Sequence, residues 1–208
     1  MGKFRLLPWI QVFVLSVSLN CFAQTPQETG FLVGQGGVEM KKVVMIIAQN
    51  DFRDEELLQP KRILEEAGIA VNVASRKTTE ARGMLGARVK PDMTIQDIKA
   101  QDFDAIIFVG GSGAGTYWDD ALAHKIAKEA HSAGKIVAAI CIAPVTLAKA
   151  GLLKNKRCTV WSSEAEKLKL VGANYTAGAV ERDGNIITAS GPQAAAQFGR
   201  EIVKALTE

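Results

Sequence analysis

The sequence contains few of the residues that build disulfide scaffolds, metal centres and histidine-dependent active sites. Its 208 residues include three cysteines and two histidines. So few cysteines do not make a disulfide framework. No group of His, Cys and Asp residues has the spacing of a metal site. We therefore expect no metal and no cofactor.

The sequence also lacks a strongly basic or acidic region and any internal repeat. The net charge is +3 over the whole chain, and no basic stripe with interleaved aromatic residues points to nucleic acid. No internal repeat or low-complexity segment is present. We expect no nucleic-acid partner, and the chain after the first forty residues is long enough for one domain with a full core.

The N-terminus has the pattern of a targeting segment. Lys3 and Arg5 precede a mostly apolar run at 6–19, and small residues end the segment at Ala23. This is typical of a signal peptide that is cleaved after Ala23. The run is too short and too interrupted to span a bilayer comfortably.

We therefore predict a signal peptide at 1–23, a linker at 24–40 and one domain at 41–208. The mature protein is expected to be periplasmic or secreted, with no membrane association after signal removal. A lipid anchor on Cys21 is the alternative, although Asn20 fits that signal poorly.

Short apolar runs alternate with amphipathic segments along the rest of the chain. This order predicts an α/β protein with a mostly parallel sheet between helices. The predicted strands are 43–48, 70–75, 105–109, 136–140, 159–161, 175–181 and 185–189, with an extended excursion at 83–90; the predicted helices are 54–68, 95–99, 119–133, 164–171 and 193–206. Asp54 is the expected N-cap of its helix, and Asp183-Gly184 is a strong hairpin turn.

The segment 136–144 carries a thiol at a predicted strand-to-helix junction. Its strand is wholly apolar, and Cys141 follows directly. A residue there projects from the carboxyl edge of the sheet, where open α/β folds bind ligands. The amino end of the next helix lowers a thiol pKa, so we expect Cys141 to be reactive, with a pKa below about 8.5. The alternative is an ordinary buried core cysteine.

The glycine-rich segment GGSGAG at 110–115 follows another predicted strand. Glycine lets the backbone approach the strand-to-helix junction at Cys141 closely. The amides of Gly111 and Ile142 are candidates for an oxyanion hole. Phosphate binding is the alternative, but the spacing fits neither the dinucleotide nor the Walker pattern. Tyr117 and Trp118 come next and either wall the pocket or pack in the core.

Three motifs in this order resemble the ThiJ/PfpI family of flavodoxin-like cysteine proteins. They are NDFRDEEL at 50–57 followed by Pro60, IFVGGSGA at 107–114 and AICIAP at 139–144. The resemblance extends over about 42–206. It implies a flavodoxin-like three-layer sandwich with a nucleophile-elbow cysteine, Cys141, in a strained backbone conformation. It also implies that Glu56 hydrogen-bonds to this cysteine.

Glu56 has two interpretations. From the residues alone it is a first-turn acid that complements the helix dipole. The resemblance favours a functional role, in which a protonated Glu56 donates a hydrogen bond to the sulfur or relays a proton. Since the site is at a helix start and not in the core, we expect Glu56→Gln to change fold stability little.

The sequence departs from the family pattern at the histidine positions. Protease-like and amidotransferase-like relatives have a histidine next to the cysteine, where this chain has Ile142. Another branch has one in the strand after the elbow helix, where Trp161 stands. His124 and His131 are predicted on the solvated face of the 119–133 helix. A Cys-His pair is missing, so peptide hydrolysis and glutamine amide transfer are disfavoured.

Two functional hypotheses follow. The first is an enzyme that uses Cys141 as nucleophile and Glu56 as proton carrier on small reactive carbonyls; the resemblance implies glyoxalase or deglycase chemistry, here without histidine. The second is a non-enzymatic oxidative-stress sensor whose Cys141 forms a sulfinate. A PfpI-type peptidase or amidotransferase-like protein ranks third.

The expected partners are a small electrophile or oxidant and a second copy in a homodimer. A bridge between Cys141 and Cys158 is possible in principle.

Overall fold

The structure, a computed structural model, describes residues 40–208. The predicted signal peptide, the cysteine at position 21 and nearly all of the predicted linker lie outside the described residues. Within the described part, no helix is both long and apolar enough to cross a membrane.

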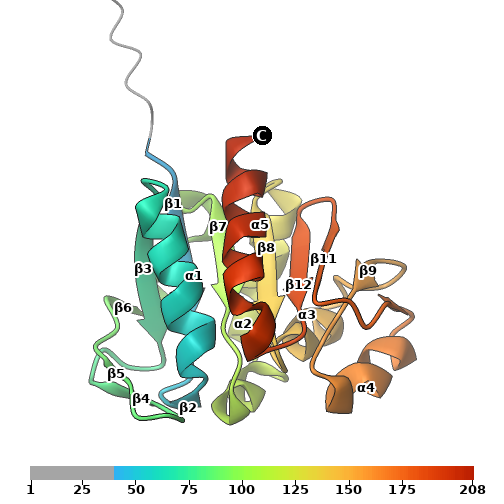
Figure 1. Cartoon of the computed structure of the whole chain (residues 1–208), viewed down its shortest axis with the longest axis horizontal. Helices are drawn as coiled ribbons and strands as arrows, with labels where there is room; N and C mark the ends of the chain where they lie inside the picture. Colours follow the sequence, from blue (N-terminus) through green and yellow to red (C-terminus); the bar gives the residue numbers. More distant parts are fainter. Residues whose placement is uncertain (1–39) are drawn as a thin grey trace, which may run out of the picture. The chain divides into compact units, whose positions relative to one another are not determined.

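A mostly parallel sheet of seven strands forms the centre of the described chain, in the order β11-β12-β8-β7-β1-β3-β6 (Figure 1). The strands are β1 (Lys42–Ile46), β3 (Ala70–Ser75), β6 (Met93–Thr94), β7 (Ala105–Phe108), β8 (Ile136–Ile140), β11 (Val180–Asp183) and β12 (Ile186–Ala189). Only β11 runs antiparallel to its neighbour. The central strands are apolar on both faces because both are covered, as parallel sheets require.

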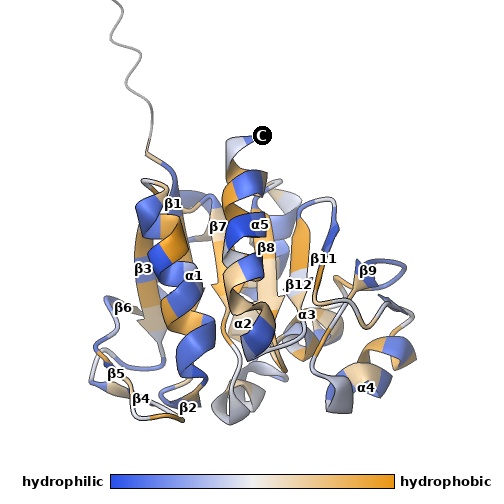
Figure 2. Ribbon diagram, in the orientation of Figure 1, coloured by the Kyte–Doolittle hydropathy of each residue, from blue (hydrophilic) through white to orange (hydrophobic). Residues whose placement is uncertain are grey.

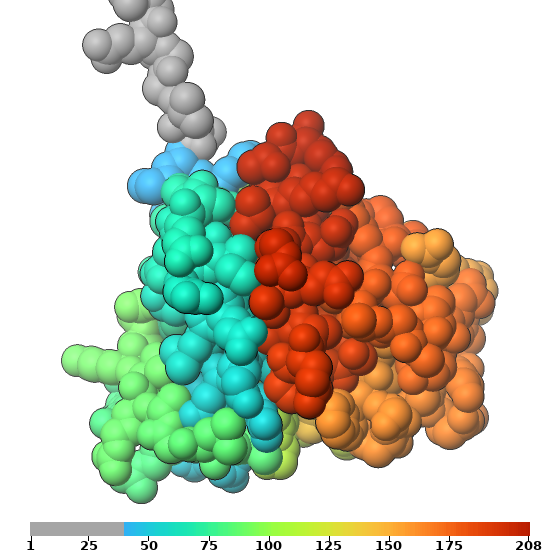
Figure 3. Space-filling model, viewed as in Figure 1, coloured from blue at the N-terminus to red at the C-terminus, as the bar shows by residue number. Residues whose placement is uncertain are grey.

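Helices cover both faces of the sheet, which makes the predicted three-layer sandwich. On one face α1 (Asp54–Glu66) and α5 (Ala195–Thr207) lie side by side (Figures 1 and 3). They form one core cluster with Val43 and Met45 of β1. The other cluster contains Val44 and Ile46 with the apolar residues of α2 (Ala121–Ser132) and α3 (Pro144–Lys149). This alternation follows from the two-residue period of a strand, and the outer sides of α1 and α5 are largely hydrophilic (Figure 2).

Smaller elements surround the sheet. They are β2 (Asn50–Phe52), β4 (Ala81–Gly83), β5 (Arg88–Val89), β9 (Arg157–Cys158), β10 (Asn174–Tyr175), α4 (Ala165–Leu170) and the 3₁₀ segments η1 (Ile95–Asp97), η2 (Ala100–Asp102), η3 (Ser112–Tyr117), η4 (Ser162–Glu164) and η5 (Pro192–Ala194). The predicted strand at 159–161 is wrong, because the paired residues of that segment are those of β9. The predicted strand at 175–181 divides between β10 and β11.

The predicted N-cap role of Asp54 is also wrong. Arg53 occupies the cap position of α1, and Asp54 lies within the helix. The carboxylate of Asp54 instead accepts hydrogen bonds from the backbone N–H groups of Leu85 (2.9 Å) and Ala87 (2.7 Å). Asp54 thereby anchors the loop after β4 beside the start of α1.

Candidate active site

Cys141 stands directly after β8, at the carboxyl edge of the sheet. Its φ of 63° lies in the left-handed region, which costs a residue with a side chain about 1–2 kcal/mol. Two hydrogen bonds hold this conformation: the N–H of Cys141 donates to Ala189 (2.9 Å), and the N–H of Trp161 donates to the carbonyl of Cys141 (2.8 Å). The strained elbow implied by the motif resemblance is therefore present.

Glu56 lies in the first turn of α1 and is fully buried. The premise that it lies outside the core is therefore wrong. Among the described residues, neither of its carboxyl oxygens makes a hydrogen bond of good geometry, although the thiol of Cys141 and the N–H of Gly110 lie close enough to favour its charged form. Burial raises the pKa of Glu56 to about 7, while the neighbouring Cys141 and the charge of Arg53 act in the opposite direction. A carboxyl with this pKa exchanges its proton near neutral pH.

Gly110 lies where the two side chains meet. A Cβ at this position would overlap both the Oε2 atom of Glu56 and the Cβ atom of Cys141. It would also lie 2.7 Å from the carbonyl oxygen of Ile140. The close approach of the glycine-rich segment to the elbow therefore depends on the missing side chain.

The thiol of Cys141 is not made acidic by its surroundings. Burial, followed by the negative charge of Glu56, raises the pKa of Cys141 to about 12. The neighbouring backbone N–H groups of Gly111 and Ile142 act in the opposite direction and lower the pKa. The expected pKa below 8.5 is wrong, because desolvation and a neighbouring carboxylate outweigh the two amides.

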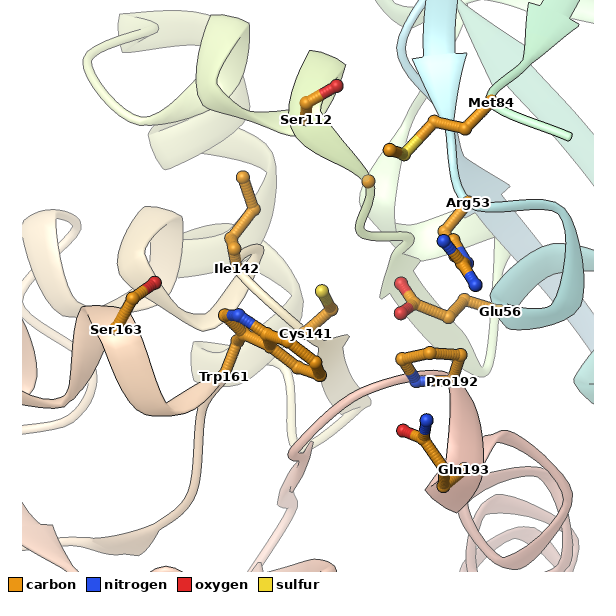
Figure 4. A pocket seen from close by; sticks show the side chains of 11 residues that line it. Arg53, Glu56, Met84, Ser112, Cys141, Ile142, Trp161, Ser163, Pro192 and Gln193 are labelled. Carbon is orange, nitrogen blue, oxygen red and sulfur yellow. The ribbon is translucent and has the colours of Figure 1, made fainter.

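The thiol and the carboxyl open into one cavity of about 360 Å³ (Figure 4). It is lined by Arg53, Glu56, Met84, Gly111, Ser112, Cys141, Ile142, Trp161, Ser163, Pro192 and Gln193. The structure thus brings together all four residues singled out as site candidates, Cys141, Glu56, Gly111 and Ile142. The phosphate-loop alternative has no support from this arrangement, in which the glycine-rich segment faces the thiol.

The aromatic residues after the glycine-rich segment pack in the core and do not line this cavity. The hydroxyl of Tyr117 donates to the carbonyl of Ile47 (2.9 Å), and the Nε1–H of Trp118 donates to the carbonyl of Ile142 (3.1 Å). Of the two interpretations, packing is therefore the correct one. Trp118 also fixes the backbone at the oxyanion candidate Ile142.

The histidines lie on α2 and do not line the cavity either. They are half-buried and not fully solvated, which corrects the sequence expectation. The Nε2 atom of His124 lies 2.8 Å from the carbonyl oxygen of Trp118, and the Nδ1 atom of His131 is buried without a partner among the described residues. Since neither histidine lines the cavity, neither is placed to act as base for Cys141.

Cys158 belongs to the core cluster on the opposite face of the sheet from Cys141. Both cysteines are free, so the bridge that the sequence left open is not formed. Across residues 40–208, no three His, Cys, Asp or Glu side chains are grouped so that they could hold a metal ion.

Sequence reasoning did not single out Arg53 and Met84 as cavity residues. The guanidinium of Arg53 pairs with both carboxylate oxygens of Glu55 (2.9 and 3.1 Å). Its position three residues before Glu56, about one helical turn, is a signal that could have found it. Met84 comes from the loop after β4, and no local pattern predicts where that loop folds back.

The fold and the site together define a flavodoxin-like α/β protein with a strained elbow cysteine beside a buried carboxyl. The chain belongs to the DJ-1/PfpI family, whose sequence profile matches residues 41–205, as the motifs predicted. It is 45% identical over 168 residues, 79% of this chain and 82% of the relative, to an uncharacterized protein of Methanocaldococcus jannaschii. It is 32% identical to a deglycase of Pyrococcus abyssi, over 78% of this chain and 98% of that protein.

The solved structures agree with this assignment. The crystal structure of a ThiJ/PfpI domain protein from Brachyspira murdochii superposes with a TM-score of 0.79 at 33% identity. The superposition covers 81% of this chain and 97% of that one.

Proposed function

We propose that this protein is an enzyme that adds the thiol of Cys141 to small reactive carbonyl compounds, with Glu56 as the proton carrier and without histidine assistance. The observation that carries the proposal is the buried carboxyl of Glu56 beside the elbow thiol, which makes no hydrogen bond of good geometry and has a pKa of about 7. A base works best when its pKa lies near the working pH. The similarity to a protein named as a deglycase supports this type of chemistry.

The first step is addition of the thiol to the carbonyl carbon. As the S–C bond forms, the π electron pair of the carbonyl moves to its oxygen, and the thiol proton passes to Glu56. Glu56 then returns this proton to the oxygen, which leaves a neutral hemithioacetal. Because the thiol is protonated at neutral pH, it depends on Glu56 as general base at the moment of attack.

An α-oxoaldehyde such as methylglyoxal can react further without any external oxidant or reductant. Glu56 moves the proton of the former aldehyde carbon to the neighbouring ketone carbon, while the hydroxyl proton of the hemithioacetal passes to the ketone oxygen. The aldehyde carbon is oxidised, the ketone carbon is reduced, and a thioester of a 2-hydroxy acid results. Water hydrolyses the thioester, which releases the acid and restores the thiol.

The backbone N–H groups of Gly111 and Ile142 have a second role in this scheme. They lie close enough to the sulfur to lower its pKa, so an oxyanion on the carbon bound to that sulfur would form beside them. Fixed donors of this kind stabilise a developing oxyanion, and removal of one typically costs about 10²–10³-fold in rate.

The lack of a histidine at Ile142 and Trp161 argues against peptide hydrolysis and amide transfer. Cysteine enzymes of these two kinds activate the thiol with a histidine base, and no histidine is among the described residues that line this cavity. We expect no cleavage of casein or fluorogenic peptides. Cleavage that disappears in Cys141→Ala would show that a peptidase is the better interpretation.

The experiment that tests the proposal is methylglyoxal consumption with detection of lactate. Wild type, Cys141→Ala and Cys158→Ala are compared, since Cys158 is a thiol on the opposite face of the sheet. We expect turnover by wild type and Cys158→Ala and none by Cys141→Ala. Equal rates for all three proteins, or no lactate from any, would overturn the proposal.

A sensor function is the second candidate, favoured by one observation. Cys141 is 9% exposed at a cavity, next to a carboxyl that can donate a hydrogen bond when it is protonated. Two equivalents of peroxide would convert the thiol to a sulfinate, each supplying one oxygen atom and leaving as water. Titration with peroxide, followed by intact mass, tests this alternative. Formation of the sulfinate in a protein that turns over no carbonyl compound would support it.

Location and assembly stay predictions. We propose a periplasmic or secreted protein that begins near residue 24, on the N-terminal sequence pattern alone, and a homodimer. The intact mass of the protein from its native host tests the first, and light scattering tests the second. A retained N-terminal segment or a lipidated mass would contradict cleavage after Ala23.

A further inference from the structure

The cavity above Cys141 is large for the smallest dicarbonyls. Its volume of about 360 Å³ lies in the range of roughly 300–1,000 Å³ that is usual for sites of drug-sized ligands. Methylglyoxal would leave most of this space to water. The remainder of the cavity is therefore available to a substituent on the carbonyl compound.

Trp161 forms a rigid wall of this space. Its backbone is tied to the elbow through the hydrogen bond to the carbonyl of Cys141 (2.8 Å). Its indole packs on Gly191, where an added Cβ would lie 2.7 Å from the ring. The side chain is nevertheless 41% exposed. A ring fixed on one face and open on the other can receive an apolar group with little loss of side-chain entropy.

Met84 approaches the cavity from the other side (Figure 4). Its N–H donates to the carbonyl of Phe52 (2.9 Å), and Asp54 holds the following residues of the loop. The side chain itself is 43% exposed. A thioether is flexible and makes favourable contacts with aromatic rings.

Polarity changes along the cavity. Its floor holds the thiol, the carboxyl of Glu56 and the amides of Gly111 and Ile142. Among the described residues that line it, the one cation is Arg53, which is paired with Glu55 and is therefore a weak site for an anionic group. Small-molecule sites are typically lined by apolar and aromatic side chains, with a few polar groups that fix the orientation of the ligand.

We infer that Trp161 and Met84 form a subsite for an apolar ring, so that the preferred electrophile is an aryl-substituted α-oxoaldehyde. The oxo groups lie on the polar floor, and the ring lies between the indole and the thioether. This inference rests on the proposed function, because it names the substrate class of the same site.

Turnover provides the first test. Initial rates with phenylglyoxal and methylglyoxal are measured for wild type, Trp161→Ala, Trp161→Phe, Met84→Ala and the control Leu170→Ala, whose side chain is 85% exposed and does not line the cavity. Intact mass confirms that arginines remain unmodified by the dicarbonyls. The ratio of kcat/KM for phenylglyoxal to that for methylglyoxal should fall about tenfold in Trp161→Ala, mainly through KM. The fall should be smaller in Trp161→Phe and Met84→Ala and absent in Leu170→Ala.

Alkylation provides a test that needs no turnover. Phenacyl bromide and bromoacetone each form an S–CH₂ bond with Cys141 and release bromide and the thiol proton. Each alkylation rate is divided by the rate of the same reagent with free cysteine. Wild type should prefer the phenacyl reagent by about tenfold, and Trp161→Ala should lose this preference.

The two tests separate the two ideas. A preference that depends on Trp161, without turnover of either dicarbonyl, would remove the proposed function and leave the ring subsite standing. A preference equal to that of free cysteine, or unchanged in both Trp161→Ala and Met84→Ala, would overturn the subsite whatever the turnover.

Discussion

The two cysteines of the described chain, Cys141 and Cys158, have similar thiol pKa values but differ in their access to the cavity. Burial is the main cause that raises the pKa of both, to about 12 for Cys141 and about 11 for Cys158. For each, nearby carboxylates act in the same direction: Glu56 at Cys141, and Glu181 and Asp183 at Cys158. A low thiol pKa therefore does not distinguish the candidate nucleophile.

What distinguishes Cys141 is access to a cavity and to a carboxyl that titrates near neutral pH. Cys141 is 9% exposed and lines the cavity, whereas Cys158 is fully buried. Glu56 has a pKa of about 7 and makes no hydrogen bond of good geometry among the described residues. In the proposed mechanism, addition to a carbonyl therefore depends on transfer of the thiol proton to Glu56 during attack, whereas alkylation by iodoacetamide uses the small fraction of thiolate that exists beforehand.

Replacing Glu56 by Gln should have the largest effect and should move two rates in opposite directions. Carbonyl turnover should fall by about 10²–10⁴-fold, because the general base is lost. Alkylation of Cys141 by iodoacetamide at pH 8 should become several-fold faster, because removal of the negative charge lowers the thiol pKa. Methylglyoxal assays and peptide mapping of the alkylated protein measure the two rates.

Cys158 is the internal control for this experiment, since its labelling should not respond to Glu56→Gln. If alkylation of Cys141 also slowed, Glu56 would be the base for alkylation as well, and the claim that its charge limits the amount of thiolate would be wrong. If neither rate changed, Glu56 would be only a helix-terminal acid.

Selective labelling of the native protein tests the comparison directly. At neutral pH, iodoacetamide should modify Cys141 roughly 100-fold faster than Cys158 or more, because reaction at Cys158 requires local opening of the core. Mild urea should narrow this difference before global unfolding. Peptide mapping over time measures both rates, and faster labelling of Cys158 would contradict the assignment of Cys141 as the accessible thiol.

Much of the fold could be predicted because its signals are local. The apolar runs that form β1, β3, β7 and β8 can be recognised without knowledge of distant contacts. The same holds for the glycine-rich segment. The position of Cys141 after β8 followed in the same way. Short edge elements such as β9 and β10 could not be predicted, since they depend on pairing with residues far along the chain.

The site was predictable in its members but not in its electrostatics. Glu56 has the sequence context of an exposed first-turn acid, and its burial comes from the packing of Gly110 and the elbow against α1. The same packing raised the pKa of Cys141, which the helix terminus alone was expected to lower. Met84 depends on a loop held by Asp54, and sequence spacing contains no information on that contact.

Fold stability should depend on pH through Glu56. Its folded-state pKa of about 7 lies above the ordinary value of 4.5, so the folded state favours the protonated form. The stability that this contributes is present below pH 4.5 and is lost as the pH rises through about 7. The difference corresponds to about 3 kcal/mol. At pH 8, Glu56→Gln should therefore be more stable than wild type by up to about that amount. At pH 4 the two proteins should have nearly the same stability.

Urea unfolding at the two pH values measures this effect, with Glu55→Gln as the matched control. Glu55 is the neighbouring carboxylate, partly exposed and paired with Arg53. Its replacement should change stability by no more than about 1 kcal/mol. Destabilisation of Glu56→Gln at pH 8 would show that the charged carboxyl is satisfied in the folded protein.

The smallest effect concerns the backbone of the elbow, which has no counterpart at Cys158. Cys141 adopts a φ of 63°, where a side chain costs about 1–2 kcal/mol relative to glycine. Cys141→Gly and Cys141→Ala both remove the thiol, but only glycine also relieves the strain. Cys141→Gly should therefore be more stable than Cys141→Ala by about 1 kcal/mol, after allowance for the greater flexibility of glycine in the unfolded chain. At Cys158 the order should reverse, since this residue is not among those with positive φ. Thermal and urea unfolding of the four variants decide the matter: equal stability of the two Cys141 variants would mean that the elbow relaxes once the thiol is gone.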